Sequence, residues 1–126
     1  MINVGFGGTL YSNIEDQMQE GLKHDYYPDF PRNYLAHKVR VEKGTHLVKI
    51  LGETTLEVNS LHHQGLKVVS SMLKPVAYAT DGLVEAIEIS DHPFGMAVQW
   101  HPEWLTDQDP MRKLFYTFVT EAGSQQ

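Results

Sequence analysis

The strongest constraint in the sequence is an Asp-Gly pair set between two runs of alternating hydrophobic and polar residues. The runs cover residues 75–80 and 83–89, and Asp81 and Gly82 lie between them. Asp-Gly is favoured in two-residue turns because both positions of such a turn take positive φ angles, which few residue pairs tolerate. The stretch predicts a β-hairpin, so any fold of this chain must contain two adjacent antiparallel strands.

Other short segments complete a mixed pattern of strands and helices. Residues 35–42 alternate with a period of two, as in a half-buried strand, and a second short strand is predicted in residues 54–58. Between them, Thr45 can cap a helix of one to two turns that ends before Gly52. The apolar run 94–100, bounded by prolines, predicts a central strand buried on both faces.

The C-terminal segment predicts an amphipathic helix. Asp109 can cap it, and Pro110 suits the first helical position. Apolar side chains then recur on one stripe that Gly123 ends: Met111, Leu114, Phe115, Phe118, Val119 and Ala122. Such a helix packs on a sheet, so the predicted fold class is α/β or α+β.

Composition argues against several classes of partner. The 126 residues suffice for one domain, and the net charge is −6 with no cluster of Lys or Arg. We therefore expect neither nucleic acid nor an anionic membrane surface as the main partner. No apolar run approaches the roughly 18 residues of a membrane span, and the first residues lack a secretory pattern, so the expected location is the cytoplasm. The chain has no cysteine, which excludes a thiol nucleophile within it.

The segment "QWHPE" at the end of the apolar run carries a candidate catalytic pair. Pro102 donates no hydrogen bond and ends the strand, which places His101 at the strand's carboxyl end, where open α/β sheets bind ligands. Glu103 follows closely enough to turn back onto the imidazole. A carboxylate on one ring nitrogen fixes the tautomer and raises the basicity of the other nitrogen, as a general base requires. The alternative is a solvated surface pair.

A second loop, "NSLHHQ", also follows a predicted strand. His62, His63 and Gln64 offer donors and acceptors suited to a polar substrate, although a turn with solvated histidines is an equal alternative. His62 or His63 could also join His101 and Glu103 in a metal site of two histidines and one carboxylate. No metal-binding spacing such as H-E-x-x-H supports that site, so no metal is expected.

Four segments together resemble the class I glutamine amidotransferase-like hydrolases, and most closely the peptidase C26 branch, which includes gamma-glutamyl hydrolases and gamma-glutamyl-gamma-aminobutyrate hydrolases. They are "INVGFGGTLYSNI", "VNSLHHQGL", "ATDGLVEAIE" and "GMAVQWHPEW", in this order along nearly the whole chain. The resemblance implies a flavodoxin-like, three-layer α/β domain. It also implies a Cys-His-Glu triad that cleaves gamma-glutamyl amides or glutamine without a cofactor. His101 matches the base, Glu103 the carboxylate, and His62, His63 and Gln64 a loop beside the substrate.

The family's nucleophilic cysteine lies on a strand-to-helix elbow, of which only the tail matches, as "MINV". By resemblance, residues 1–126 are the C-terminal half of one domain, and the cysteine would precede Met1. We therefore expect no hydrolase activity from the chain alone, and either a homodimer or a complementing N-terminal fragment as partner. A non-catalytic module that binds gamma-glutamyl ligands is the alternative function. Ser60 could substitute for the nucleophile, but it lacks an elbow.

Overall fold

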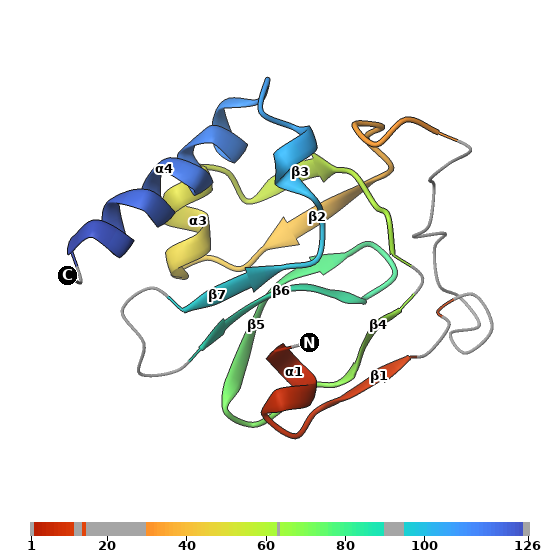
Figure 1. Ribbon diagram of the computed structural model, residues 1–126. Helices are drawn as coiled ribbons and strands as arrows, with labels where there is room; N and C mark the ends of the chain where they lie inside the picture. Colours follow the sequence, from red (N-terminus) through yellow and green to blue (C-terminus); the bar gives the residue numbers. More distant parts are fainter. Residues whose placement is uncertain (1, 12–13, 15–29, 63, 90–94, 125–126) are drawn as a thin grey trace.

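The computed structural model describes residues 2–11, 14, 30–62, 64–89 and 95–124, and these form two antiparallel sheets with helices around them (Figure 1). The larger sheet has the strand order β3-β2-β5-β6-β7, and the smaller one pairs β1 with β4. The strands are β1 (Thr9–Tyr11), β2 (His37–Val41), β3 (Thr55–Val58), β4 (Gly65–Val68), β5 (Leu73–Ala79), β6 (Val84–Ile89) and β7 (Met96–Val98).

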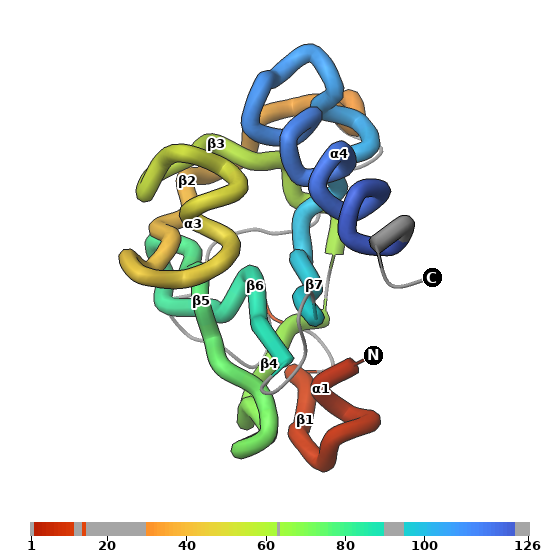
Figure 2. The backbone as a smooth tube through the Cα atoms, turned by 90° about the vertical axis from the view of Figure 1, so that its left-hand side faces the viewer, coloured from red at the N-terminus to blue at the C-terminus, as the bar shows by residue number. Residues whose placement is uncertain are grey.

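The helices lie on two sides of the large sheet. Helices α3 (His46–Leu51) and α4 (Asp109–Ser124) pack together on one side, whereas α1 (Ile2–Gly5) lies beside β1 on the other (Figures 1 and 2). A 3₁₀ turn, η1 (Pro102–Trp104), connects β7 to α4. The main core lies between the sheet and the α3–α4 pair, and its largest members are Trp100, Leu47, Leu51, Leu105 and Met111.

The predicted hairpin and the first capped helix are present, but the hairpin loop has three residues instead of two, because the Ala79 amide donates to the Leu83 carbonyl and the Gly82 amide to the Ala79 carbonyl. β5 and β6 pair antiparallel around the turn, where Gly82 has a φ of 87° and the Asp81 carboxylate accepts a hydrogen bond from the backbone of Leu83. In α3 the Thr45 hydroxyl accepts from the Val48 amide at 3.2 Å, and Gly52 closes the helix in the left-handed conformation. Both are local sequence signals that tertiary packing leaves intact.

Two predictions about burial were wrong. The run 94–100 does not form a central strand: β7 covers Met96–Val98, is half-buried, and pairs with β6 at the end of the described sheet order. The stripe of α4 is covered only at its start, because α3 packs against Met111 and Leu114 while Phe118 and Val119 stay 58% and 68% exposed. A periodic sequence pattern shows that one side of a helix or strand is apolar. It does not show how much of that side other helices and strands cover.

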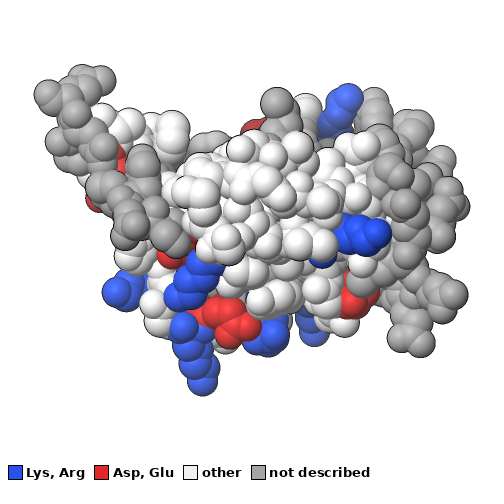
Figure 3. Space-filling model, turned by 90° about the horizontal axis from the view of Figure 1, so that it is seen from below, with Lys and Arg blue, Asp and Glu red and all other residues white. Residues whose placement is uncertain are grey.

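The side on which α1 lies has a broad area formed by uncharged residues (Figure 3). Helix α1 and the turn after it contribute Ile2, Val4 and Phe6 to the exposed apolar surface, and Val68 and Met72 are exposed at β4 and the turn after it. Exposed apolar area of this extent is typical of surfaces that contact another polypeptide. Among the described residues, no helix is long and apolar enough to cross a membrane; a cytoplasmic location stays a prediction.

Asn3 fixes α1 to the smaller sheet. Its side-chain amide donates to the carbonyls of Thr9 and Val68, and its side-chain oxygen accepts from the Ser70 amide at 2.8 Å. Gly8 lies so close that a Cβ there would come within 2.4 Å of three Asn3 side-chain atoms. A side chain at position 8 would therefore displace Asn3 from bonds that join segments 65 and 67 residues apart.

We expect Gly8→Ala to lower the free energy of unfolding by about 1–3 kcal/mol, because the buried polar atoms of Asn3 lose partners. Gly5→Ala is the matched control, since a Cβ at Gly5 has no neighbour within 4 Å among the described residues. Urea denaturation of the two variants measures the difference. Equal stabilities would show that Asn3 does not anchor α1.

Candidate functional site

His101 and Glu103 form a close pair at the end of β7. The Nδ1 atom of His101 lies 2.6 Å from Oε1 of Glu103. The turn η1 brings the carboxylate back, because Pro102 starts the turn and the Leu105 amide donates to the Pro102 carbonyl at 2.9 Å. A carboxylate on Nδ1 orients the ring and leaves Nε2 as the atom that can exchange a proton with a reacting group.

Buried residues on both sides hold the pair in place. Trp100 and Leu105 are core residues, 2% and 1% exposed, whereas the side chains of His101 and Glu103 are 43% and 50% exposed. The indole nitrogen of Trp100 donates to the sulfur of Met111 on α4 at 3.3 Å. The core therefore holds the segment at both ends, at Trp100 and Leu105. The side chains of His101 and Glu103 between them face solvent, where a substrate could reach them.

Asn59, which the sequence did not single out, clamps the backbone of His101. Its side-chain oxygen accepts from the His101 amide at 3.0 Å, and its side-chain nitrogen donates to the His101 carbonyl at 2.9 Å. The same nitrogen donates to the Arg32 carbonyl at 2.9 Å, and Asn59 is 1% exposed. The residue thus ties the loop after β3 to the candidate base, 42 residues away. Its only sequence signal is its place directly before Ser60 and the two histidines.

The predicted substrate loop is described in part. His62 is 8% exposed, and its Nδ1 lies 2.7 Å from the carbonyl oxygen of Gln64. Gln64 is exposed and His63 lies outside the described residues. The loop ends at Gln64, because Gly65 begins β4. The substrate-binding role of His62, His63 and Gln64 stays a prediction.

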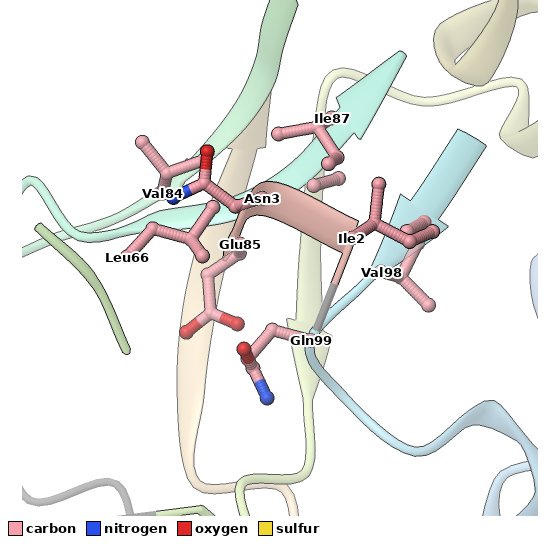
Figure 4. Close-up of a pocket in the computed structure, with 10 residues that line it drawn as sticks. Ile2, Asn3, Leu66, Val84, Glu85, Ile87, Val98 and Gln99 are labelled. Carbon is pink, nitrogen blue, oxygen red and sulfur yellow. The ribbon is translucent and has the colours of Figure 1, made fainter. Parts of the chain in front are cut away.

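Two neighbouring pockets of about 250 Å³ each lie against this loop and β6. One is lined by Ile2, Glu85, Val98 and Gln99 among others (Figure 4). The other is lined by His62, Gln64 and Gln99, with Leu10, Leu61, Gly65 and Leu66. Gln99 lines both, and it stands two residues before His101. The polar groups of the loop and the end of β7 therefore meet at one region of the surface.

Glu85 is the second residue that the sequence analysis did not identify. It lies on β6 next to buried Ala86 and points toward the Gln99 side of the pocket (Figure 4), yet it is only 2% exposed. Its Oε1 lies 3.4 Å from Nε2 of His37 and 3.7 Å from Nε2 of His62. An alternating strand pattern places a glutamate on the solvent side, so only the tertiary structure shows that this one is enclosed.

The other chemical alternatives find little support in the described part of the chain. There, no group of three His, Cys, Asp or Glu residues is arranged to hold a metal ion. Ser60, the substitute nucleophile, is 1% exposed, which keeps its hydroxyl from an external substrate.

The fold is that of the class I glutamine amidotransferase-like proteins. A crystal structure of a GMP synthase component from Thermoplasma acidophilum superposes with a TM-score of 0.71 at 16% identity, covering 98% of this chain and 53% of that one. The α/β fold class predicted from the resemblance is therefore confirmed. Every strand pair that the structure describes is antiparallel, so the described residues do not form a doubly wound parallel sheet.

The chain belongs to the Peptidase C26 family, whose sequence profile matches residues 1–103. It is 43% identical over 122 residues to the gamma-glutamyl-gamma-aminobutyrate hydrolase PuuD of Escherichia coli, covering 93% of this chain and 48% of that protein. It is 40% identical to Protein NtpR of Enterococcus hirae, covering 96% of this chain and 51% of that protein. The chain thus spans about half the length of the curated relatives that it matches.

Proposed function

We propose that this chain supplies the general base, its carboxylate partner and the substrate-side loop of an enzyme that hydrolyses gamma-glutamyl amide bonds. The observation that carries the proposal is the 2.6 Å contact between His101 and Glu103 just after β7, two residues beyond Gln99, which lines two pockets. Membership of the Peptidase C26 family and the likeness to a gamma-glutamyl-gamma-aminobutyrate hydrolase support the substrate class.

In the proposed reaction a cysteine thiolate attacks the gamma-carbonyl carbon of the substrate. His101 accepts the thiol proton through Nε2 and passes it to the departing amine, which leaves a thioester. Water then attacks the thioester, His101 removes the water proton, and the carboxylic acid and the thiol are released. Glu103 holds the ring with Nδ1–H toward its own oxygen, which stabilises the imidazolium that forms at each transfer.

The thiol must come from a second polypeptide segment, because this chain contains no cysteine. We propose that the chain is the C-terminal half of such a domain and that a segment with the N-terminal half completes it. Three observations support this: the relatives are about twice as long, β7 pairs on one side only among the described strands, and α1 and α4 expose apolar side chains. An unpaired strand edge and an uncovered apolar surface favour association.

The test is to mix this chain with a separately purified N-terminal half of the Escherichia coli relative that contains its cysteine elbow. A 1:1 complex in sedimentation experiments, together with release of glutamate from gamma-glutamyl-gamma-aminobutyrate, supports the proposal. A stable homodimer that ignores the added half contradicts the completion of the domain. Binding of the substrate without turnover in a well-formed 1:1 complex favours the alternative, a non-catalytic ligand-binding module.

Within the completed complex, we expect Glu103→Gln to lower kcat by roughly 10²-fold or more while changing KM little, because an amide orients the ring less well and cannot stabilise the imidazolium. Glu57→Gln is the control, since Glu57 is exposed on β3. Steady-state kinetics on both variants measure kcat and KM separately. A Glu103→Gln variant with full kcat would remove Glu103 from the mechanism.

A further inference from the structure

An arginine lies against the turn that carries Glu103, and the proposed triad does not use it. The guanidinium carbon of Arg32 is 5.0 Å from the centre of the Trp104 ring, and Trp104 directly follows Glu103 in η1. The backbone carbonyls of Arg32 and His101 both accept from the side-chain nitrogen of Asn59, each at 2.9 Å. Arg32 is therefore tied to the segment of the candidate pair through its backbone and through its side chain.

The segment that carries Arg32 has a defined shape. Arg32 is the first central residue of a turn in which the Tyr34 amide donates to the Pro31 carbonyl at 3.0 Å. The rings of Phe30 and Tyr34 stack across this turn, with their centroids 4.5 Å apart. In Figures 1 and 2 the segment, coloured orange before β2, lies beside η1. A cation on such a turn is positioned before a ligand arrives, which reduces the entropy cost of binding.

The chemistry of Arg32 suits a carboxylate ligand. A guanidinium presents its N–H donors along the edges of its plane, in a geometry that matches the two oxygens of a carboxylate. Arg32 is exposed, so a ligand can approach it from solvent. A gamma-glutamyl amide can offer a carboxylate from two places, the glutamyl part and the leaving amine.

The charges around the two pockets indicate which of the two carboxylates Arg32 would meet. Among the described residues that line these pockets there is no Lys or Arg, and Glu85 contributes a carboxylate to one of them. The glutamyl part brings an ammonium group together with its carboxylate, whereas a leaving amine that is still bound as an amide brings only the negative charge, which Glu85 repels. Gln99 lines both pockets and precedes His101, and Trp104 follows it. The leaving amine therefore fits better on the side of Arg32.

We propose that Arg32 is a specificity-determining residue that binds a carboxylate on the leaving amine of the substrate. The inference rests on the proposed function, because it takes a gamma-glutamyl amide as the substrate. The carboxylate is bound equally in the ground state and in the transition state, so Arg32 acts on KM more than on kcat. The Arg32 carbonyl can bind Asn59 whatever side chain the position carries, so a substitution tests the guanidinium and not the turn.

The first test compares two substrates of the completed complex, gamma-glutamyl-gamma-aminobutyrate and gamma-glutamyl-butylamide, which differ in the carboxylate of the leaving amine. We expect Arg32→Gln to lower kcat/KM for the carboxylated substrate by about 10- to 100-fold, the loss typical of a hydrogen bond to a charged group, and to leave the other unchanged. Arg32→Lys should restore part of the loss. Arg40→Gln is the matched control, because Arg40 is an exposed arginine on β2 that also lies over an aromatic ring, 5.4 Å from the centre of Tyr78.

Two kinetic results overturn the inference and leave the proposed function standing. An unchanged kcat/KM of Arg32→Gln for the carboxylated substrate would show that Arg32 does not bind it. An equal loss with both substrates would assign Arg32 to the glutamyl part or to the fold. If the complex hydrolyses neither substrate, the proposed function fails, and binding to the chain alone decides the inference.

That binding is measured by nuclear magnetic resonance on the full chain, which has two tryptophans. The indole signal of Trp104 is the one that Trp104→Phe removes. We expect gamma-aminobutyrate to shift this signal more than gamma-aminobutyramide, which lacks the carboxylate, and we expect Arg32→Gln to abolish the difference. Equal shifts from the two compounds, or a difference that persists in Arg32→Gln, overturn the inference.

Discussion

Purified alone, this chain should release no glutamate from a gamma-glutamyl amide, and activity should appear when a polypeptide with the cysteine elbow completes the domain. In that complex, His101→Asn should lower kcat by about 10³-fold or more, because the substitution removes the group that moves the proton in both half-reactions. His46→Asn is the matched control: His46 is an exposed histidine on α3, 4.0 Å from Glu88, and lies in neither pocket described above. A coupled assay for free glutamate measures all three proteins.

Two outcomes would contradict this expectation. Hydrolysis by the isolated chain would show that a nucleophile other than cysteine operates within it. Full activity of the His101→Asn complex would show that the pair at the end of β7 is not the base and its carboxylate, however short their contact.

Asn59→Leu should lower the free energy of unfolding by about 2–4 kcal/mol, the second large effect that we expect. The substitution leaves three backbone groups without their partner: the amide and the carbonyl of His101 and the carbonyl of Arg32. Buried polar groups that lose a partner cost about 1–3 kcal/mol each, and some regain water. Asn59→Asp should be destabilising as well, because a carboxylate oxygen replaces the donor that faces both carbonyls.

The matched control is Asn33→Leu, at an exposed asparagine next to Arg32. Thermal denaturation compares the stabilities, and the backbone amide signal of His101 reports directly on the clamp. In the completed complex the Asn59 variants should lose kcat more than substrate affinity, because they displace the base. If the Asn59 variants had wild-type stability and an unshifted His101 amide signal, Asn59 would not be the residue that positions His101.

The loop after β3 contributes both to the clamp on the His101 backbone and to the lining of a pocket. The loop after β3 carries the clamp for the His101 backbone at its start, and it carries His62 and Gln64 further on. On β6, Oε1 of Glu85 lies 3.7 Å from Nε2 of His62, and the Glu85 carbonyl accepts a hydrogen bond from the Gln99 amide at 2.7 Å. The loop that clamps the backbone of His101 thus also carries two residues that line a pocket, so we expect a change in the loop to affect both substrate binding and proton transfer in the proposed complex.

The sequence by itself determined the features whose causes lie within a few residues. The turn at Asp81 and Gly82, the capped helix at Thr45, and the pairing of His101 with Glu103 two residues away all follow from local backbone geometry. The family resemblance also rested on short segments, two of which contain the Asp81-Gly82 turn and the His101–Glu103 pair, which is why the fold class could be predicted.

Only the tertiary structure decided which polar residues meet across the chain. Asn59 reaches His101 across 42 residues, and Glu85 lies between His37 and His62, which come from different elements. It also decided that β7 ends the described sheet and that much of the stripe on α4 is left uncovered. Strand alternation and helix periodicity state which side of an element a residue occupies. Contacts between distant elements depend on sheet order and layer packing, and no local pattern encodes these.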